Sequence, residues 1–168
     1  PILSQLVQKA LLQNIKLKFE LFCAPNIQAS FLKPFIKNDN IKINKGPILT
    51  SFQNIDFAVV ASGTASLECA ITLTPMVVIY KMSAFSWWIT KCFIKTPFAS
   101  IVNILAEKKI VPELLQQDLT ASHLLHIIKE SFKNPEQLKE NQNQIFNIIQ
   151  PLAIKDVYKN TSAYIANY

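Results

Sequence analysis

The segment Ser62-Gly-Thr-Ala-Ser-Leu-Glu68 combines hydroxyls, one glycine and a carboxylate within seven residues. Backbone N–H groups and hydroxyls bind a phosphate, and a carboxylate can accept hydrogen bonds from a sugar diol. Thr64 and Glu68 are four residues apart, so on a helix they share a face. The segment therefore predicts a nucleotide-sugar site. An ordinary strand-to-helix turn remains the alternative, although Thr64 and Glu68 miss the three-residue spacing of a capping box.

The elements around this segment should place it at the edge of a sheet. The apolar run 57–61 is typical of a buried parallel strand, and residues 64–71 are expected to form a helix. Gly63 then lies at a strand-to-helix turn, where the N–H groups and the positive end of the helix dipole face an anion.

The rest of the chain alternates helices and apolar strands, which predicts an α/β fold. We expect a Rossmann-like parallel sheet with helices on both faces, in residues 1–134, and a helical carboxyl-terminal extension, residues 135–168. The other expected strands are 19–23, 41–43, 76–80 and 110–111, and residues 97–106 are expected to be a loop. The other expected helices are 2–15, 27–36, 49–54, 84–94, 120–132, 135–149 and 153–168.

Composition excludes several classes of function. The chain has 168 residues, a net charge of +6, and only two glycines, Gly46 and Gly63, so it has no Gly-x-Gly-x-x-Gly or Walker A loop. All 17 basic residues are lysine, which argues against nucleic-acid binding and suits an anionic membrane surface. Cys23, Cys69 and Cys92 form no pair in sequence, so we expect buried, reduced thiols in a cytosolic protein.

Two histidines and the hydropathy add no further site. His123 and His126 are three residues apart with no third ligand nearby, so surface histidines are favoured over a zinc site. No signal peptide is evident, and no apolar stretch reaches the ~18 residues of a membrane span.

Several longer motifs resemble the lipid-A-disaccharide synthases of Gram-negative bacteria. They include Ala61-Ser-Gly-Thr-Ala-Ser-Leu-Glu68, Thr74-Pro-Met-Val-Val-Ile-Tyr-Lys-Met82, Asn103-Ile-Leu-Ala106 and Val111-Pro-Glu-Leu-Leu-Gln116. The resemblance implies a glycosyltransferase of two Rossmann-like domains that joins UDP-diacylglucosamine to diacylglucosamine 1-phosphate and releases UDP. This chain resembles the carboxyl-terminal, UDP-binding half, and no cofactor or metal is implied.

The resemblance also implies which residues bind UDP. Ser62, Gly63 and Thr64 would hold the diphosphate, Glu68 the ribose hydroxyls, and Asn103 would face the phosphates or the sugar. Glu113, Gln116 and Gln117 would open a helix near the same pocket, and Tyr80 with Lys81 would end the neighbouring strand. Lys81 replaces the usual arginine of the family and keeps its charge. No residue of this chain is expected to be the general base.

Aromatic and basic residues alternate between positions 81 and 95, a mixture typical of a membrane interface. The residues expected to contact the membrane are Phe85, Trp87, Trp88, Lys91, Phe93 and Lys95. We therefore expect a cytoplasmic protein bound peripherally to the inner membrane, although an ordinary buried helix explains the tryptophans equally well.

Two further interpretations stay open. The chain could be a non-catalytic remnant that only associates with a membrane or a partner. It could also be another UDP-sugar enzyme of the same fold, such as a peptidoglycan N-acetylglucosaminyl transferase or an epimerase. By the resemblance, the chain begins after the first, central strand of the doubly wound order, and the amino-terminal acceptor domain is absent. We therefore expect strands 19–23 and 57–61 to flank a vacancy.

Overall fold

The computed structural model of the protein describes residues 2–22, 27, 30, 41–44, 52, 54–83, 87 and 96–153. The described strands are β1 (Phe19–Phe22), β2 (Ile41–Asn44), β3 (Ala58–Ala61), β4 (Met76–Tyr80) and β5 (Glu113–Leu115). The described helices are α1 (Ile2–Leu12), α4 (Thr64–Ile71), α6 (Ile101–Ala106), α7 (Ala121–Lys133) and α8 (Pro135–Ile149), followed by the 3-10 turn η2 (Gln150–Ala153). The predicted α/β class is confirmed.

The strands form two parallel sheets. One has the order β3-β4-β5, with Ala61 opposite Ile79 and Ile79 opposite Leu114. The other pairs β1 with β2. The side chains of β4 are almost wholly apolar, and Val77 and Val78 are fully buried, because both faces of the sheet are covered.

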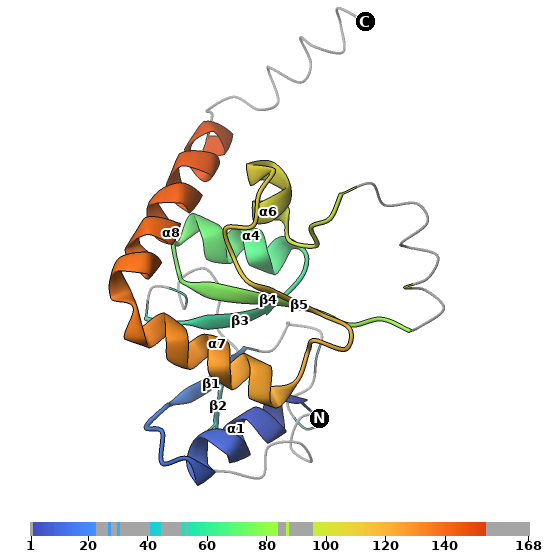
Figure 1. Cartoon of the computed structure of the whole chain (residues 1–168), viewed down its shortest axis with the longest axis vertical. Coiled ribbons are helices and arrows are strands. Elements are labelled where there is room, and N and C mark those ends of the chain that lie inside the picture. Colours follow the sequence, from blue (N-terminus) through green and yellow to red (C-terminus); the bar gives the residue numbers. More distant parts are fainter. Residues whose placement is uncertain are drawn as a thin grey trace, which may run out of the picture.

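Helices cover both faces of the three-stranded sheet, as Figure 1 shows. On one face Val60 and Val78 pack with residues of α4, α6 and α8, including Cys69, Val102 and Ile145. On the other face Val77 and Leu114 pack with apolar residues of α1 and α7. Successive side chains along each strand therefore pack into the apolar cores on opposite faces of the sheet.

Local signals explain where the helices around the sheet begin. The Thr120 hydroxyl accepts a hydrogen bond from His123 N–H at 3.1 Å and caps α7. Pro135 occupies the first turn of α8, where its missing N–H costs nothing. The predicted bounds of α4, β4 and α8 agree with the structure, and the predictions for α1 and α7 differ by one to three residues.

Two predictions between residues 97 and 111 were wrong. The expected loop 97–106 contains α6, because the buried Ser100 hydroxyl accepts a hydrogen bond from Asn103 N–H and caps a helix. The expected strand 110–111 lies at 113–115 instead. The N–H groups of Ile110 and Val111 bind the Asn103 side chain rather than a strand, so pairing with β4 starts later.

Among the described strands, β1 is not paired with β3, and the vacancy left by a missing first strand stays a prediction. The N–H groups of Ala58 and Ser62 point to β4, where they bind the carbonyls of Pro75 and Ile79. By the alternation of a strand, Val59 and Ala61 point their N–H and C=O groups to the opposite edge of β3, where no described strand pairs. The two sheets share a core instead, since Phe19 and Val59 pack in one cluster.

Several sequence predictions lie outside the described residues. These are nearly all of the expected helices 27–36, 49–54 and 84–94, and the last helix beyond residue 153. The boundary between domains at residues 134 and 135 stays a prediction. On its far side, α8 places Ile145 in the core shared with β3 and β4.

Candidate functional site

The turn from β3 into α4 presents backbone N–H groups that no side chain caps. Gly63 is the N-cap of α4, with φ 133° and ψ −154°, a conformation that favours glycine. A Cβ on Gly63 would meet nothing within 4 Å, so the space beside the Gly63 backbone, where a side chain would lie, is open. The N–H groups of Thr64 and Ala65 come before the hydrogen-bonded part of the helix. The turn can therefore accept an anion close to its backbone.

Thr64 and Glu68 lie one turn apart on α4, as the sequence predicts. The Thr64 side chain is exposed and Glu68 is half-buried. Among the described residues, none forms an ion pair or hydrogen bond with the Glu68 carboxylate. One hydroxyl donor and one carboxylate acceptor are thus available beside the open turn, which is what a phosphate joined to a sugar diol requires.

Ser62 is tied to the protein rather than open to a ligand. Its Oγ donates a hydrogen bond to Ala99 O at 2.6 Å, and its N–H donates to Ile79 O at 3.0 Å. Both of its protons are therefore used, and only its oxygen lone pairs remain. Of the three residues expected to hold the diphosphate, Gly63 and Thr64 are the ones whose donors make no hydrogen bond within the described part of the chain.

Asn103 does not face a ligand in this structure. Its side chain is fully buried, and its Oδ1 accepts hydrogen bonds from the N–H groups of Ile110 and Val111 at 2.8 and 3.0 Å. Its Nδ2 donates to Val111 O at 2.9 Å and to the Glu113 carboxylate at 2.7 Å. Two acceptor sites and two protons are all that an amide has. The expectation that Asn103 faces the phosphates therefore differs from its observed position.

Glu113 lies in β5 and does not open a helix, which corrects the sequence interpretation. Its carboxylate accepts hydrogen bonds from Ala99 N–H at 3.0 Å, from Ser100 N–H at 2.9 Å and from Asn103 Nδ2. Glu113 thus fastens the segment before α6 to the sheet. These three donors stabilise the negative charge of the half-buried carboxylate.

Gln116 closes the carboxyl edge of the sheet. It has a positive φ of 51°, directly after β5, so Gln116 and Gln117 also do not open a helix. Gln116 N–H donates to Tyr80 O, and its Oε1 accepts from Met82 N–H at 3.1 Å. The half-buried Tyr80 ends β4, while Lys81 and Gln117 are exposed just beyond the strands. The carboxyl ends of parallel strands form the ligand edge of such sheets, so these residues lie on the expected side.

Ser100 and Ala99 are the residues that sequence reasoning missed. Glu113 accepts hydrogen bonds from the N–H groups of Ala99 and Ser100, and Ser62 donates to the carbonyl of Ala99. A signal was present for Ser100, because serine directly before an apolar stretch is a helix N-cap pattern. Ala99 has no side-chain signal, since only its backbone takes part.

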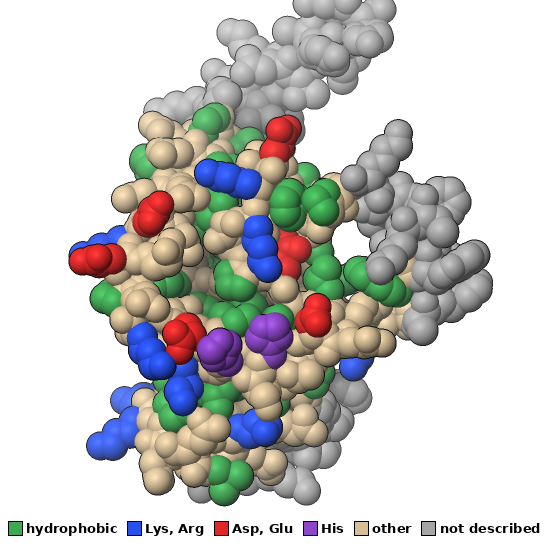
Figure 2. Space-filling view, in the orientation of Figure 1, with side chains coloured by type: hydrophobic (Ala, Val, Ile, Leu, Met, Phe, Trp, Pro, Cys, Tyr) green, Lys and Arg blue, Asp and Glu red, His purple; other side chains and the backbone are tan. Residues whose placement is uncertain are grey.

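Other hollows lie away from this edge. One of about 250 Å³ opens between α7 and α8, and another of similar volume lies between α1 and α7, lined by Lys9, Lys129 and Lys133 among others. Neither includes a predicted site residue. Figure 2 shows basic and acidic side chains interspersed on this side of the molecule. Among the described residues, no group of three His, Cys, Asp or Glu could hold a metal, and His123 and His126 are exposed.

The predicted membrane residues fall almost wholly outside the described chain. Phe85, Trp88, Lys91, Phe93 and Lys95 lie outside it, and Trp87 is half-buried. Within the described part, no helix has the length and apolar character needed to cross a bilayer.

Of the cysteines, Cys69 lies within the described residues, where it is free and buried. Burial raises its thiol pKa to about 12. This agrees with the expectation of a reduced, buried thiol at this position.

Comparisons with known proteins point to one family. A family model described as lipid-A-disaccharide synthetase matches residues 3–166. The chain is 36% identical over 155 residues to lipid-A-disaccharide synthase 1 of Legionella pneumophila, covering 91% of this chain and 40% of that protein. It is 43% identical over 93 residues to the lipid-A-disaccharide synthase of Saccharophagus degradans, covering 54% of this chain and 24% of that protein. The chain thus spans less than half the length of these curated relatives.

Proposed function

Because this chain belongs to the lipid-A-disaccharide synthetase family, we propose that it is the UDP-binding half of a glycosyltransferase of lipid A biosynthesis. The reaction transfers diacylglucosamine from UDP-diacylglucosamine to diacylglucosamine 1-phosphate, giving lipid A disaccharide 1-phosphate and UDP. The family assignment favours this function over that of another UDP-sugar enzyme. A non-catalytic remnant that keeps the same motifs remains the second candidate.

The observation that carries this proposal is the open turn at Gly63 beside an unpaired carboxylate. The uncapped N–H groups and the Thr64 hydroxyl suit the diphosphate, and Glu68 on the same helix face suits the ribose hydroxyls. Lys81, exposed after β4, adds a positive charge at the same edge of the sheet. Together they supply the two kinds of contact that distinguish a nucleoside diphosphate from free phosphate.

The acceptor site and the general base belong, in this proposal, to the part of the family proteins that this chain does not match. The Legionella relative is about two and a half times as long as the matched segment, which covers 40% of it. The edge of β3 that pairs with no described strand, and the separate β1–β2 sheet, are compatible with a further strand between them. We expect no disaccharide from this chain alone, and activity when the remaining domain is added.

Calorimetry with UDP tests the proposed site. Replacing Glu68 with Ala should weaken UDP binding by about 1–3 kcal/mol, because the ribose hydroxyls lose their acceptor. Glu136→Ala is a matched control, since Glu136 is an exposed glutamate on α8. ATP and NAD should bind more weakly than UDP. Equal affinity of the wild type and Glu68→Ala for UDP would refute the assigned role.

Peripheral membrane contact through residues 81–95 is part of the same proposal, because both substrates are lipids. Lys81, Lys91 and Lys95 alternate with aromatic residues in that segment. Sedimentation with vesicles should show binding to anionic but not to neutral lipids, weakened by salt. Binding that ignores lipid charge would contradict it.

A further inference from the structure

We propose that Asn103 and Glu113 are positioning residues that set the geometry of the Gly63 turn through Ala99 and Ser62, without contacting the nucleotide. This inference rests on the proposed function, since it assigns a role toward the same turn. It differs from the expectation drawn from the family resemblance, which gives both residues a direct ligand contact.

A continuous series of hydrogen bonds connects the four residues. Asn103 holds the backbone of Val111 and donates to the Glu113 carboxylate at 2.7 Å. Glu113 accepts the Ala99 N–H at 3.0 Å, and the Ala99 carbonyl accepts the Ser62 hydroxyl at 2.6 Å. Ala99 is thus held on one side by the network and on the other by the residue immediately before Gly63.

The register of the sheet explains why this series reaches the turn. Val60, Val78 and Glu113 are in register across β3, β4 and β5, and Val60 and Val78 face the core beneath α4 and α6. Glu113 therefore points to the same face of the sheet as α4, the helix that Gly63 begins. Segment 96–100 connects Glu113 to the Gly63 turn, because Ser100 N–H binds Glu113 and Ala99 O binds the Ser62 hydroxyl.

Saturation of the hydrogen bonds argues against direct ligand contact. Asn103 is fully buried with all four of its hydrogen-bonding positions used. The negative charge of Glu113 would repel a diphosphate, and it is instead directed at three N–H donors within the protein. Because the Asn103 amide and the Glu113 carboxylate already have protein partners, they can affect a ligand only indirectly, by fixing the conformation of segment 96–100.

The two glycines of the chain allow a direct test. In protein labelled with ¹⁵N-glycine, only Gly46 and Gly63 give backbone amide peaks, and Gly46→Ala identifies the Gly63 peak. We expect Glu113→Gln to displace the Gly63 peak without any ligand, because the new amide protons face three donors. Ser62→Ala should displace it as well, while leaving the Asn103–Glu113 contact in place. Glu113→Gln should also weaken UDP binding roughly tenfold, the equivalent of one lost hydrogen bond to a charged group.

Thr74→Val is the matched control. Thr74 is 4% exposed and donates to Phe52 O at 3.1 Å, before the start of β4 at the other edge of the sheet. Its replacement should lower stability and leave the Gly63 peak and UDP affinity unchanged.

Each result separates the positioning role from the proposed function. An unmoved Gly63 peak in folded Glu113→Gln overturns the inference, and so does a displaced peak with unchanged UDP affinity. Loss of UDP binding with an unmoved peak indicates direct contact and also overturns it. If Glu113→Gln does not fold, Glu113→Asp, whose shorter side chain withdraws the carboxylate from its donors, decides by the same criteria. If wild-type protein does not bind UDP, the proposed function fails, while the Gly63 peak still decides whether the network controls the turn.

Discussion

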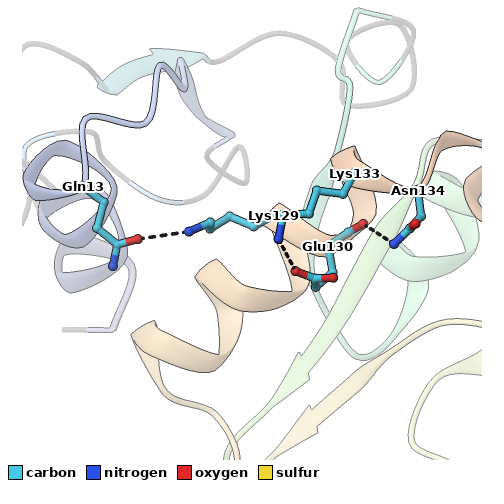
Figure 3. A network of polar contacts seen from close by, with 5 residues as sticks. All are labelled: Gln13, Lys129, Glu130, Lys133 and Asn134. Carbon is cyan, nitrogen blue, oxygen red and sulfur yellow. Dashed lines mark hydrogen bonds and ion pairs between the residues drawn. The ribbon is translucent and has the colours of Figure 1, made fainter.

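Two polar networks of this protein use similar residue types with opposite burial. At the carboxyl edge of the sheet, Asn103 and Glu113 lie among α6 and the strands, and every hydrogen-bonding position of Asn103 has a protein partner. Along α7, Lys129 reaches Gln13 of α1 at 3.4 Å, and Lys133 binds Glu130 at 2.8 Å. Figure 3 shows this second network, with Asn134 donating to the carbonyl of Glu130.

The difference shows that hydrogen-bond length is a poor guide to what a contact contributes. The Lys133–Glu130 and Asn103–Glu113 contacts are 2.8 and 2.7 Å long. Water can replace either partner of the exposed pair, so that pair adds little to stability. Removal of a buried partner leaves donors and acceptors that water cannot reach. The following predictions compare the two regions, from the largest expected effect to the smallest.

The same substitution in both regions gives the largest contrast. Asn103→Ala should lower the free energy of unfolding by roughly 3–5 kcal/mol, because it orphans the buried N–H groups of Ile110 and Val111 and removes one of the three donors to Glu113. Asn134→Ala should change it by no more than about 0.5 kcal/mol, since Asn134 is exposed. Urea denaturation of both variants measures the difference. Equal losses would show that burial does not separate the two networks.

Gly63→Ala tests whether the Asn103–Glu113 network holds the backbone of the Gly63 turn in its observed conformation. A Cβ there meets no atom within 4 Å, so any loss reflects the φ of 133° rather than a clash. We expect a loss of roughly 1–3 kcal/mol by the same denaturation measurement. A variant as stable as the wild type would mean that the turn relaxes freely and is not held by the network.

The Cys69 thiol tests how tightly the core behind the turn is closed. Its folded pKa of about 12 lies above the usual thiol value of 9.0, so the unfolded chain loses the proton first. The stability contribution is complete below pH 9 and falls as pH rises toward 12. Alkylation at pH 8 followed by peptide mass spectrometry should modify Cys69 much more slowly in the native than in the urea-unfolded protein. Equal rates would show that solvent enters this core.

The smallest effect is expected on the exposed side. The Lys133 hydrogen bond, and then its charge, lower the pKa of Glu130 below its usual value. Lys133→Ala should therefore raise that pKa in an NMR titration and leave the melting temperature within error at neutral pH. The pair's contribution exists at neutral pH and disappears as pH falls through the folded pKa. Lys139→Ala, on exposed α8, should leave the titration unchanged.

The sequence predicts elements well where a local signal defines both ends. Pro135 and the apolar stripe locate α8, and the apolar run 76–80 locates β4. Between residues 97 and 113 the prediction failed, because Asn103 takes up the N–H groups of Ile110 and Val111. These contacts join residues seven and eight positions apart, and the spacing of apolar residues in the sequence does not indicate them.

The candidate site follows the same rule. Gly63, Thr64 and Glu68 sit on one turn and its helix, so their spacing alone brought them together. Glu113 and Ser62 are joined through the backbone of Ala99, which has no sequence signature. Whether Glu113 meets a ligand or the protein depends on the register of β5 with β4, a tertiary property.

The edge of β3 that pairs with no described strand bears on how this chain behaves in solution. Ala58-Val-Val-Ala61 carries no lysine, proline or bulge, the devices that usually keep an open strand from pairing with another molecule. A run of four apolar residues whose outer backbone groups pair with no described strand is a template for backbone hydrogen bonding between copies of the chain. At high protein concentration, self-association should therefore begin at β3, and one lysine in place of the exposed Ala61 should suppress it.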